Sequence, residues 1–552
     1  MAATPLTKNT LFYGDNLKIL REYIADTSVD LIYLDPPFSS NRNYNVLFRN
    51  ENGTQSAAQI TAFEDTWHWN ETTALTYHEL VTSAAPQVAT MISALREFIG
   101  ENQMMAYLVM MAARLIELHR VLKPTGSLYL HCDPTASHYL KIVLDTIFGA
   151  DKFVNELVWK RSDAHSDSKQ GAKHYGRIHD VLLFYAKNHN HVFNTLYLPL
   201  SEKTTENWYR NIEQETGRRY NKADTSGPGG AAKGNPYYEW KGITRYWRYN
   251  REKMERLEAE GKLVYSKSGI AYEKRYLDEN KGISLQDWWD DIGMLRGLDK
   301  GGERLGYPTQ KPLALLERII SASSNAGDLV LDPFCGCGTT IHAAQKSDRR
   351  WIGIDITHLA IAIQKYRLKD AFNIVEKQDY SVIGEPEDLH GARQLAQDDP
   401  YQFQWWALSL IQAQPLGGQT GRKQGKKGKD RGIDGIITFI DDATGKLKRL
   451  LVQVKSGKVK SGDVRDLRGP IERENAALGV LITLEKPSKD MATEAAAADT
   501  YLSPGWNKPY PKIQILTIER LLTGATVQMP PSGMTFKKAQ REQQIAPQGQ
   551  LL

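Results

Sequence analysis

One stretch in the second half of the chain limits its possible folds more than any other. Residues 328–332 form an apolar run, and a glycine-rich turn over residues 333–338 follows it. A helical pattern over residues 340–347 leads to a second apolar run, residues 351–355, and each run ends in an aspartate. This order predicts the βαβ unit in which a nucleotide binds at the carboxyl ends of parallel strands. The turn lacks the third glycine of the dinucleotide pattern, which disfavours NAD.

Another apolar run, residues 29–34, ends in the tetrapeptide Asp35-Pro36-Pro37-Phe38. The two prolines have a fixed φ and no N–H group, so the nearby carbonyl groups stay free to accept hydrogen bonds. A carboxylate, a free carbonyl and an aromatic ring are suited to holding a planar amino group while the ring stacks on a base. The alternative is an ordinary turn in which Asp35 caps the bend, and the tetrapeptide alone leaves both interpretations open.

The rest of the chain indicates an α/β protein with an insertion. Strand and helix patterns alternate up to residue 187 and again over residues 303–385, which predicts a sheet of parallel strands. Within the first part, the polar residues 41–70 are predicted to form a long loop beside the site.

The insertion, residues 188–302, interleaves aromatic and basic residues without a clear period. Basic side chains neutralise phosphates and aromatic rings stack on bases, so this region is predicted to bind DNA. Arg210, Arg245 and Arg248 are the candidate DNA-binding side chains. The alternative is a solvated surface domain whose aromatic residues form its own core.

Three motifs resemble those of amino-directed DNA methyltransferases. Residues 35–38 resemble the D-P-P-[YFW] motif, residues 332–338 resemble the D-P-F-x-G-x-G loop that binds S-adenosylmethionine, and residues 307–312 resemble the [HY]-P-T-Q-K-P segment that precedes this loop. The catalytic motif comes before the cofactor motif, with the basic insertion between them. This order resembles the circularly permuted β class, and the resemblance covers residues 10–385.

The resemblance implies a Rossmann-like methyltransferase sheet with an inserted target-recognition region. It also implies that Asp35 and the Pro36 carbonyl accept hydrogen bonds from an exocyclic amine. Pro37 would complete the rigid turn, and Phe38 would stack on the extruded base. Asp35, in place of serine, favours transfer to adenine N6 in double-stranded DNA over cytosine N4, which stays the alternative. This step requires no metal ion.

For the cofactor, S-adenosylmethionine, the resemblance implies that the acid after the first strand, Asp15, faces the adenine. Asp355 would hold the ribose hydroxyls, because a carboxylate offers two acceptor oxygens. The full set implied for the cofactor is Asp15, Thr309, Lys311, Asp332, Phe334, Gly336, Gly338 and Asp355.

The C-terminal segment resembles the Mrr-like branch of the PD-(D/E)-x-K nucleases, through Asp434, Gln453 and Lys455. In that family the acid, here Asp434, holds Mg²⁺, and the lysine positions or activates water. Gln453 stands where many relatives have glutamate, and the preceding helix offers Gln402 and Gln404 in place of acids. A single carboxylate provides few of the oxygen ligands that Mg²⁺ needs. An active nuclease, which would make this a single-chain restriction-modification enzyme, and a DNA-binding domain without cleavage both stay open.

The length of 552 residues predicts several domains. We expect a methyltransferase core over residues 1–187 and 303–385, the insertion over 188–302, a smaller α/β restriction-endonuclease-like domain over 395–525, and a tail over 526–552.

The composition narrows the class of protein further. The 3 cysteines and the absence of a long apolar run predict a cytoplasmic protein without disulfides or membrane contact. The net charge of +5 is small, so any DNA-binding surface must come from local clusters of charge. The complete methylase motifs disfavour a decayed, non-catalytic DNA-binding protein. Asp35, where asparagine would favour an RNA or protein methyltransferase, disfavours that class. A homodimer and a separate restriction subunit stay open.

Overall fold

The computed structural model describes residues 3–37, 43–49, 55–64, 69–163, 171, 173–295, 303, 305, 309–415, 433–441 and 447–530, with only the backbone given for residues 43–49 and 55–64. The chain divides into two compact units, of which one is Thr195–Gln286 and the other is the remainder. The smaller unit lies inside the predicted insertion. Phe38 and most of the predicted tail lie outside the described residues.

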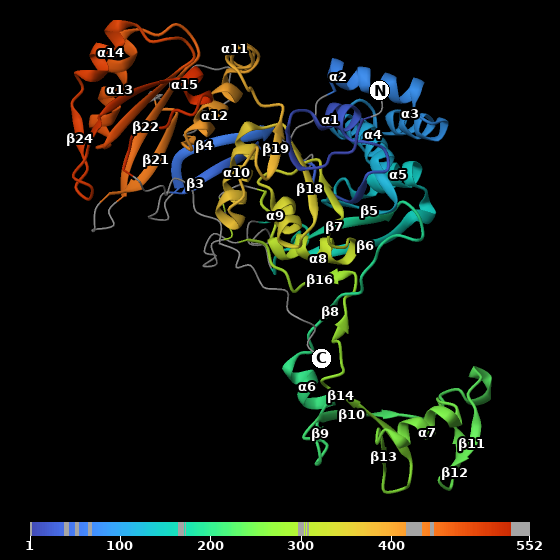
Figure 1. Cartoon of the computed structure of the whole chain (residues 1–552). Helices are drawn as coiled ribbons and strands as arrows, with labels where there is room; N and C mark the ends of the chain where they lie inside the picture. Colours follow the sequence, from blue (N-terminus) through green and yellow to red (C-terminus); the bar gives the residue numbers. More distant parts are fainter. Residues whose placement is uncertain are drawn as a thin grey trace. The chain divides into compact units, whose positions relative to one another are not determined.

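The larger unit is built on a nine-stranded sheet in the part of the chain that is described, with the order β16-β6-β7-β5-β2-β17-β18-β1-β19 (Figure 1). All neighbouring strands are parallel except for β7, which is antiparallel to both β5 and β6. The predicted α/β sheet is therefore confirmed, and the expectation of parallel strands is wrong for β7. The strands are β1 (Asn9–Tyr13), β2 (Val29–Leu34), β5 (Leu122–Cys132), β6 (Phe153–Lys160), β7 (His179–Ala186), β16 (Trp288–Trp289), β17 (Leu329–Asp332), β18 (Arg350–Asp355) and β19 (Tyr380–Ile383).

The central pair of strands comes from distant parts of the sequence. Leu31 and Ile32 of β2 pair with Val330 and Leu331 of β17 in parallel register. Because both strands run in the same direction, their carboxyl ends lie at the same edge of the sheet. This pairing brings the turn after β2 next to the glycine-rich turn after β17.

Helices cover the sheet and bury its apolar residues. Helix α4 is the most deeply buried helix of the N-terminal half. Residues such as Met105, Leu108 and Leu115 are fully inaccessible to solvent. Helices α9 and α10 pack on β17, β18 and β1. The helices of the methyltransferase-like part are α1 (Asn16–Tyr23), α2 (Glu71–Ser83), α3 (Pro86–Ile99), α4 (Gln103–Val121), α5 (Ser137–Phe148), α8 (Leu313–Ser323), α9 (Thr339–Lys346) and α10 (His358–Phe372).

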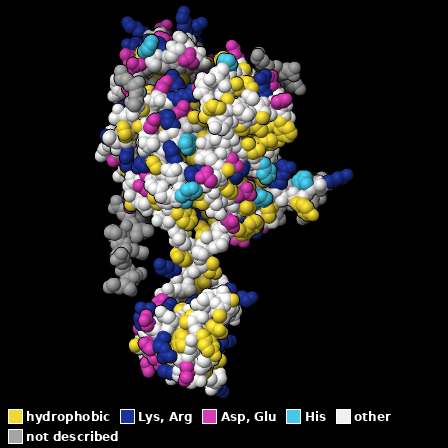
Figure 2. All heavy atoms as spheres, turned by 90° about the vertical axis from the view of Figure 1, so that its right-hand side faces the viewer, with side chains coloured by type: hydrophobic (Ala, Val, Ile, Leu, Met, Phe, Trp, Pro, Cys, Tyr) yellow, Lys and Arg dark blue, Asp and Glu magenta, His cyan; other side chains and the backbone are white. Residues whose placement is uncertain are grey.

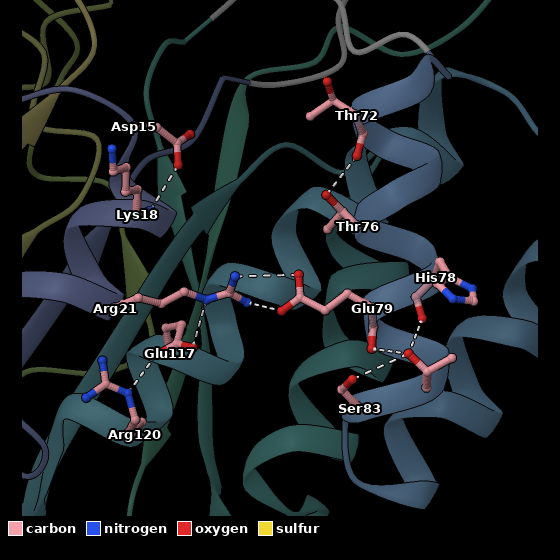
Figure 3. A network of polar contacts seen from close by, with 11 residues as sticks. Asp15, Lys18, Arg21, Thr72, Thr76, His78, Glu79, Ser83, Glu117 and Arg120 are labelled. Carbon is pink, nitrogen blue, oxygen red and sulfur yellow. Dashed lines mark hydrogen bonds and ion pairs between the residues drawn. The ribbon is translucent and has the colours of Figure 1, made fainter. Parts of the chain in front are cut away.

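An ion-pair network joins three of these helices (Figure 3). Arg21 of α1 donates to Glu79 of α2 at 2.5 Å and to Glu117 of α4 at 3.2 Å. Arg120 donates to the second oxygen of Glu117 at 2.6 Å and to the carbonyl of Leu20 at 2.6 Å. The network thus fixes the C-terminal end of α1 against α2 and α4.

The predicted loop over residues 41–70 is wrong in part, because two strands form within it. Strands β3 (Asn43–Arg49) and β4 (Gln55–Glu64) pair in antiparallel register. Every second residue of β3 from Tyr44 to Phe48 is aromatic or β-branched, and this period of two favours a strand despite the polar composition.

The smaller unit is an antiparallel β structure with two short helices. Trp240, Trp247, Met254, Leu257 and Leu263 form its core. Some of the aromatic residues of the insertion therefore fill a core, as the alternative interpretation held. The elements are β8 (Tyr197–Leu198), α6 (Glu202–Trp208), β9 (Asn211–Ile212), β10 (Arg219–Asp224), β11 (Tyr237–Trp240), β12 (Ile243–Tyr246), α7 (Arg251–Ala259), β13 (Leu263–Tyr265), β14 (Ala271–Tyr276) and β15 (Ile283–Ser284).

The C-terminal part forms a second, smaller α/β sheet with the order β20-β21-β22-β23-β26. Separate apolar clusters lie around its helices α12 and α13. Its elements are α11 (Leu389–Asp398), α12 (Pro400–Leu410), β20 (Gln414–Pro415), β21 (Gly435–Ile440), β22 (Leu447–Lys455), α13 (Ser461–Arg473), β23 (Leu478–Thr483), α14 (Lys489–Ala496), β24 (Thr500–Leu502), β25 (Pro509–Pro511), β26 (Ile513–Thr517) and α15 (Ile518–Leu522). Among the helices of the described ranges, none is long and apolar enough to cross a membrane.

Candidate active site

The turn after β2 places Asp35 at the carboxyl edge of the main sheet. Asp35 is 15% exposed, and its Oδ2 accepts a hydrogen bond from the ammonium group of Lys311. Pro36 is buried and Pro37 is half-buried. Lys311, which the sequence assigned to the cofactor, thus contacts the proposed catalytic acid. Phe38 lies outside the described residues.

A chain of buried polar groups lies directly behind this turn. The hydroxyl of Tyr33 lies 2.9 Å from His131 Nδ1, and His131 Nε2 lies 3.3 Å from Asp180. Asp180 also pairs with Arg161 at 3.3 Å. Burial raises the pKa of Tyr33 well above its ordinary value, so its hydroxyl stays protonated. This chain could not be predicted from the sequence, because its members lie on β2, β5 and β7 and just after β6, and no local motif joins them.

The glycine-rich turn after β17 has the backbone geometry that its glycines allow. Gly336 and Gly338 have positive φ values of 47° and 74°. A Cβ atom at Gly338 would lie 2.6 Å from Gln364 Cγ. Gln364 in turn donates to the Gly336 carbonyl at 2.8 Å. The turn is therefore fixed from behind. The backbone conformation disfavours a side chain at both glycines, and the close approach of Gln364 also excludes one at Gly338.

Asp332, the last residue of β17, is a buried carboxyl group held by the turn. One oxygen accepts from the backbone N–H of Phe334 at 3.0 Å and the other from the hydroxyl of Thr340 at 2.5 Å. Burial raises the pKa of Asp332 to about 7, and the charges of Asp35 and Asp355 act in the same direction. Asp332 therefore lies close to Asp35, and its hydrogen bonds to Phe334 and Thr340 hold the two ends of the glycine-rich turn.

Asp355 at the end of β18 is in contact with the same turn. One oxygen accepts from the Gly336 N–H at 2.9 Å, and the other accepts from the N–H and the hydroxyl of Thr357, both at 2.9 Å. Burial raises the pKa of Asp355 to about 6, although these hydrogen bonds act in the opposite direction. The acid is thus oriented by the turn and the following helix.

Asp15 caps helix α1 at the end of the neighbouring strand. Its carboxylate accepts from Lys18 N at 3.1 Å and from the guanidinium of Arg114 at 2.7 Å. Arg114, which is 4% exposed, also donates to Asn16 at 2.5 Å. Asn16 donates to the carbonyl of Pro333 at 2.8 Å. Arg114 and Asn16, which the sequence analysis did not single out, therefore connect the end of β1 to the glycine-rich turn.

The donors and acceptors of these groups match those of a nucleoside cofactor that carries an amino acid. A cavity of about 30 Å³ lies beside the turn, lined by Thr309, Lys311, Phe334 and Gly336 among others. Asp355 offers acceptor oxygens for hydroxyl groups, and the ammonium of Lys311 can hold a carboxylate. The structure thus brings most of the predicted cofactor residues together around one edge of the sheet.

The candidate DNA-binding arginines lie in the smaller unit. Arg210 and Arg248 are exposed, and Arg245 lies 5.5 Å from the ring of Trp247. Arg245 and Arg248 lie near Asp224, whose pKa is lowered by a Ser226 hydrogen bond and by these two charges, against the effect of its burial. In the lower part of Figure 2, positive, negative and hydrophobic side chains are interspersed on this unit. The role of these arginines in DNA binding stays a prediction.

In the C-terminal domain the three residues predicted for the nuclease site lie at the expected places on or next to two neighbouring strands. Their side chains do not form a metal centre. Asp434 precedes β21, and Gln453 and Lys455 lie at the end of β22. The two oxygens of Asp434 accept from Gln404 Nε2 at 2.9 Å and from the N–H of Val454 at 2.6 Å. Within the described ranges there is no group of three or more His, Cys, Asp or Glu side chains that could hold a metal ion.

One N–H donor occupies part of the acceptor capacity of each Asp434 oxygen, and a Mg²⁺ site needs several further oxygen ligands. Gln404 donates from its amide nitrogen to Asp434. A carboxylate in the place of this amide would instead add negative charge. Lys455 lies 3.5 Å from Asp463, so its charge is partly balanced within the domain. The tentative assignment of Mg²⁺ to Asp434 therefore has no support in the geometry of these side chains.

The main sheet and its glycine-rich turn define a nucleotide-binding α/β protein with a carboxylate beside the nucleotide site. The sequence profile of a family described as DNA methylase, which comprises N6 and N4 methyltransferases, matches residues 29–365. This match covers more than half of the chain, and the protein belongs to the DNA methylase family. A second profile, described as NACHT-associated inactive Restriction Endonuclease 1, matches residues 416–523. The methylase domain is thus followed by an inactive restriction-endonuclease-like domain.

Several curated proteins are similar to the methylase part. Type II methyltransferase M.EcaI of Enterobacter cloacae is 29% identical over 363 residues, or 63% of this chain and 66% of that protein. The Mod subunit of the type III restriction-modification enzyme StyLTI of Salmonella typhimurium is 27% identical, over 62% of this chain and 50% of that protein. DNA adenine methyltransferase YhdJ of Escherichia coli is 26% identical, over 65% of this chain and 82% of that protein. The chain thus matches less than two thirds of the length of the first two relatives.

The glycine-rich turn gives the first prediction. Gly338→Ala forces a Cβ atom against Gln364 at a positive φ, so the turn must shift. We expect the affinity for S-adenosylhomocysteine to fall by about tenfold or more, since strain and a close contact together cost about 1–3 kcal/mol. Calorimetry measures this, with Gly293→Ala as the control because no atom lies within 4 Å of its Cβ position. Equal affinity in both variants would contradict the proposed position of the cofactor.

The buried acid gives a pH-dependent prediction. The folded protein holds a proton on Asp332 up to about pH 7, whereas the unfolded chain loses it near pH 4. The free energy of unfolding should therefore fall as the pH rises through this window. Asp332→Asn removes this dependence. The variant should therefore be more stable than the wild type at pH 8, by about 1–4 kcal/mol, and this difference should be smaller at pH 5. Chemical denaturation at both values tests this, and an equal difference at pH 5 and pH 8 would contradict it.

The C-terminal domain gives a prediction about metal binding. The wild-type protein should not bind Mg²⁺ at this site at millimolar concentrations, because the described side chains include no group of three or more His, Cys, Asp or Glu ligands there. The double variant Gln404→Glu, Gln453→Glu should bind Mg²⁺ with a Kd of about 1 mM or tighter, since it supplies the missing carboxylates. Calorimetry compares the two, with Gln87→Glu as a control for added charge. Mg²⁺-dependent DNA cleavage by the wild type would overturn this interpretation.

Proposed function

We propose that this protein transfers a methyl group from S-adenosylmethionine to the N6 amino group of adenine in double-stranded DNA. The observation that carries the proposal is the position of Asp35. Its carboxylate lies at the end of β2, and β2 pairs directly with β17, which leads into the glycine-rich turn. The acid that would hold the amine and the turn that would hold the cofactor are therefore neighbours.

The methyl group is supplied by the sulfonium of the cofactor, which is already electrophilic. The contribution of the chain is then to hold and orient the amine. Asp35 would accept one N–H of the amino group and the carbonyl of Pro36 would accept the other. The nitrogen becomes positive as the bond forms, and the carboxylate stabilises this charge. The two prolines offer no N–H donor of their own that would compete for these acceptors.

The target base must leave the duplex before Asp35 can reach its amino group. Extrusion costs on the order of a few kcal/mol, which base stacking and phosphate contacts offset. Phe38 is proposed to stack on the extruded base. Arg210, Arg245 and Arg248 are proposed to contact phosphates, since arginine forms strong hydrogen bonds with phosphate oxygens.

Adenine is favoured over cytosine by the aspartate that begins the turn and by the similarity to a DNA adenine methyltransferase. The family comprises both N6 and N4 methyltransferases, so cytosine N4 is the second candidate. The similarity to a type II methyltransferase and to a type III Mod subunit supports a role in restriction and modification. Since the C-terminal domain is of the inactive class, cleavage in such a system would come from a separate restriction subunit.

The experiment removes the amine acceptor. Asp35→Ala should lower methyl transfer to DNA by about 100-fold or more, because the developing charge loses its partner. Binding of S-adenosylhomocysteine should persist, because the variant leaves the glycine-rich turn and Asp355 in place. A tritiated-methyl assay on genomic DNA and calorimetry separate the two effects. Glu97→Ala, an exposed acid on α3, is the control. Full activity of Asp35→Ala would refute the assignment.

A further inference from the structure

The ion pair between Asp35 and Lys311 conflicts with the task proposed for Asp35. The ammonium group binds the same carboxylate that would accept the amine of the target base. The two side chains are only 15% and 14% exposed, so the pair is shielded from water and stronger than an exposed pair. In this arrangement one acceptor oxygen of Asp35 is occupied.

The charge of Lys311 also opposes the reaction. The amine nitrogen becomes positive during methyl transfer, and a second positive charge on Asp35 would raise the energy of that state. Lys311 must therefore move away from Asp35 before the base is held in a reactive position.

Lys311 lies between the turn after β2, which holds Asp35, and the glycine-rich turn. It lines the same cavity as Gly336 and Phe334. Burial raises the pKa of Cys337, and the charge of Lys311 acts in the opposite direction. The pKa of Asp180 is lowered against its burial, mainly by the hydrogen bond to His131, and Lys311 acts in the same direction as that bond. The ion pair of Lys311 and Asp35 thus lies near both the polar chain behind Tyr33 and the glycine-rich turn. Among the residues that line this cavity in the described structure, Lys311 is the one with a positive charge.

The backbone at Lys311 is fixed while its side chain is long and flexible. The side-chain amide of the preceding residue, Gln310, is held at both ends. Its oxygen accepts from the Leu305 N–H at 2.8 Å, and its nitrogen donates to the Glu303 carbonyl at 2.7 Å. The following residue, Pro312, is buried and leads directly into α8. The ammonium group can therefore change partners by rotation of its four-carbon stem, without movement of the turn.

We propose that Lys311 is a positioning residue that exchanges partners: it holds Asp35 in the free enzyme and moves to the carboxylate of the cofactor when the cofactor binds. Cofactor binding then frees Asp35 to accept the amine of the base. This proposal rests on the proposed function, because it takes the cofactor to be an amino acid-bearing nucleoside. It deepens that function by making the grip on the base dependent on the cofactor.

Two ligands distinguish the exchange from general effects on the cavity. S-adenosylhomocysteine carries the carboxylate and has a neutral thioether, so the charge of a sulfonium does not enter the comparison. Methylthioadenosine carries the same nucleoside without the carboxylate. Lys311→Met should weaken S-adenosylhomocysteine by about tenfold or more, as expected for a lost charge-assisted hydrogen bond, and leave methylthioadenosine unchanged. Lys311→Arg should restore part of the affinity.

The decisive variant is Asp35→Asn, which keeps the shape of the side chain and removes its charge. If Lys311 must leave Asp35 in order to bind the cofactor, Asp35→Asn should tighten S-adenosylhomocysteine by about two- to tenfold. This gain should disappear in the Lys311→Met background, because there is no lysine left to release. Calorimetry on the full-length wild type, the two single variants and the double variant gives all four affinities.

Each outcome decides the proposal. An undiminished gain in the Lys311→Met background would show direct repulsion between Asp35 and the ligand, and would refute the exchange. Unchanged affinity in either single variant would also refute it. The proposed function fails in a different way, through the absence of S-adenosylhomocysteine binding to the wild-type protein. Failure of the exchange and failure of the function are therefore distinguishable.

Discussion

The parallel pairing of β2 with β17 is the constraint on which the rest of the active site depends. Leu31 and Ile32 align with Val330 and Leu331, and the two strand ends therefore reach the same edge of the sheet. The Asp35 turn and the glycine-rich turn are almost 300 residues apart in sequence, and this alignment makes them neighbours. A shift of register by one residue would point the side chains of either strand to the opposite face and separate the two turns.

Three carboxyl groups meet at this edge, and their charges must be balanced. Asp332 and Asp355 are satisfied by hydrogen bonds from the turn and from α9 and α10, and burial raises the pKa of each. Asp35 is balanced by Lys311, which comes from the segment before α8. The charge of Asp35 is thus balanced within the site, and burial favours the neutral form of the other two carboxyl groups.

Much of this arrangement could be predicted from the sequence, because the strands, the glycine-rich turn and the Asp35 turn are encoded locally. The contacts that fix these motifs could not be predicted. Arg114 reaches Asp15 across 99 residues, and His131 joins Tyr33 to Asp180 across three strands. The C-terminal domain shows the same limit. Its sequence left cleavage open, and the contact between Gln404 and Asp434, which are 30 residues apart, appears only in the structure.

The central claim is that the edge of this sheet methylates an exocyclic amine of adenine. The most direct measurement is mass spectrometry of the nucleosides from unmethylated DNA that has been incubated with the protein and S-adenosylmethionine labelled with deuterium in its methyl group. The account predicts labelled N6-methyladenine. Labelled N4-methylcytosine would confirm the amine chemistry and correct the base. Label on a ring carbon, or no labelled nucleoside at all, would contradict the account.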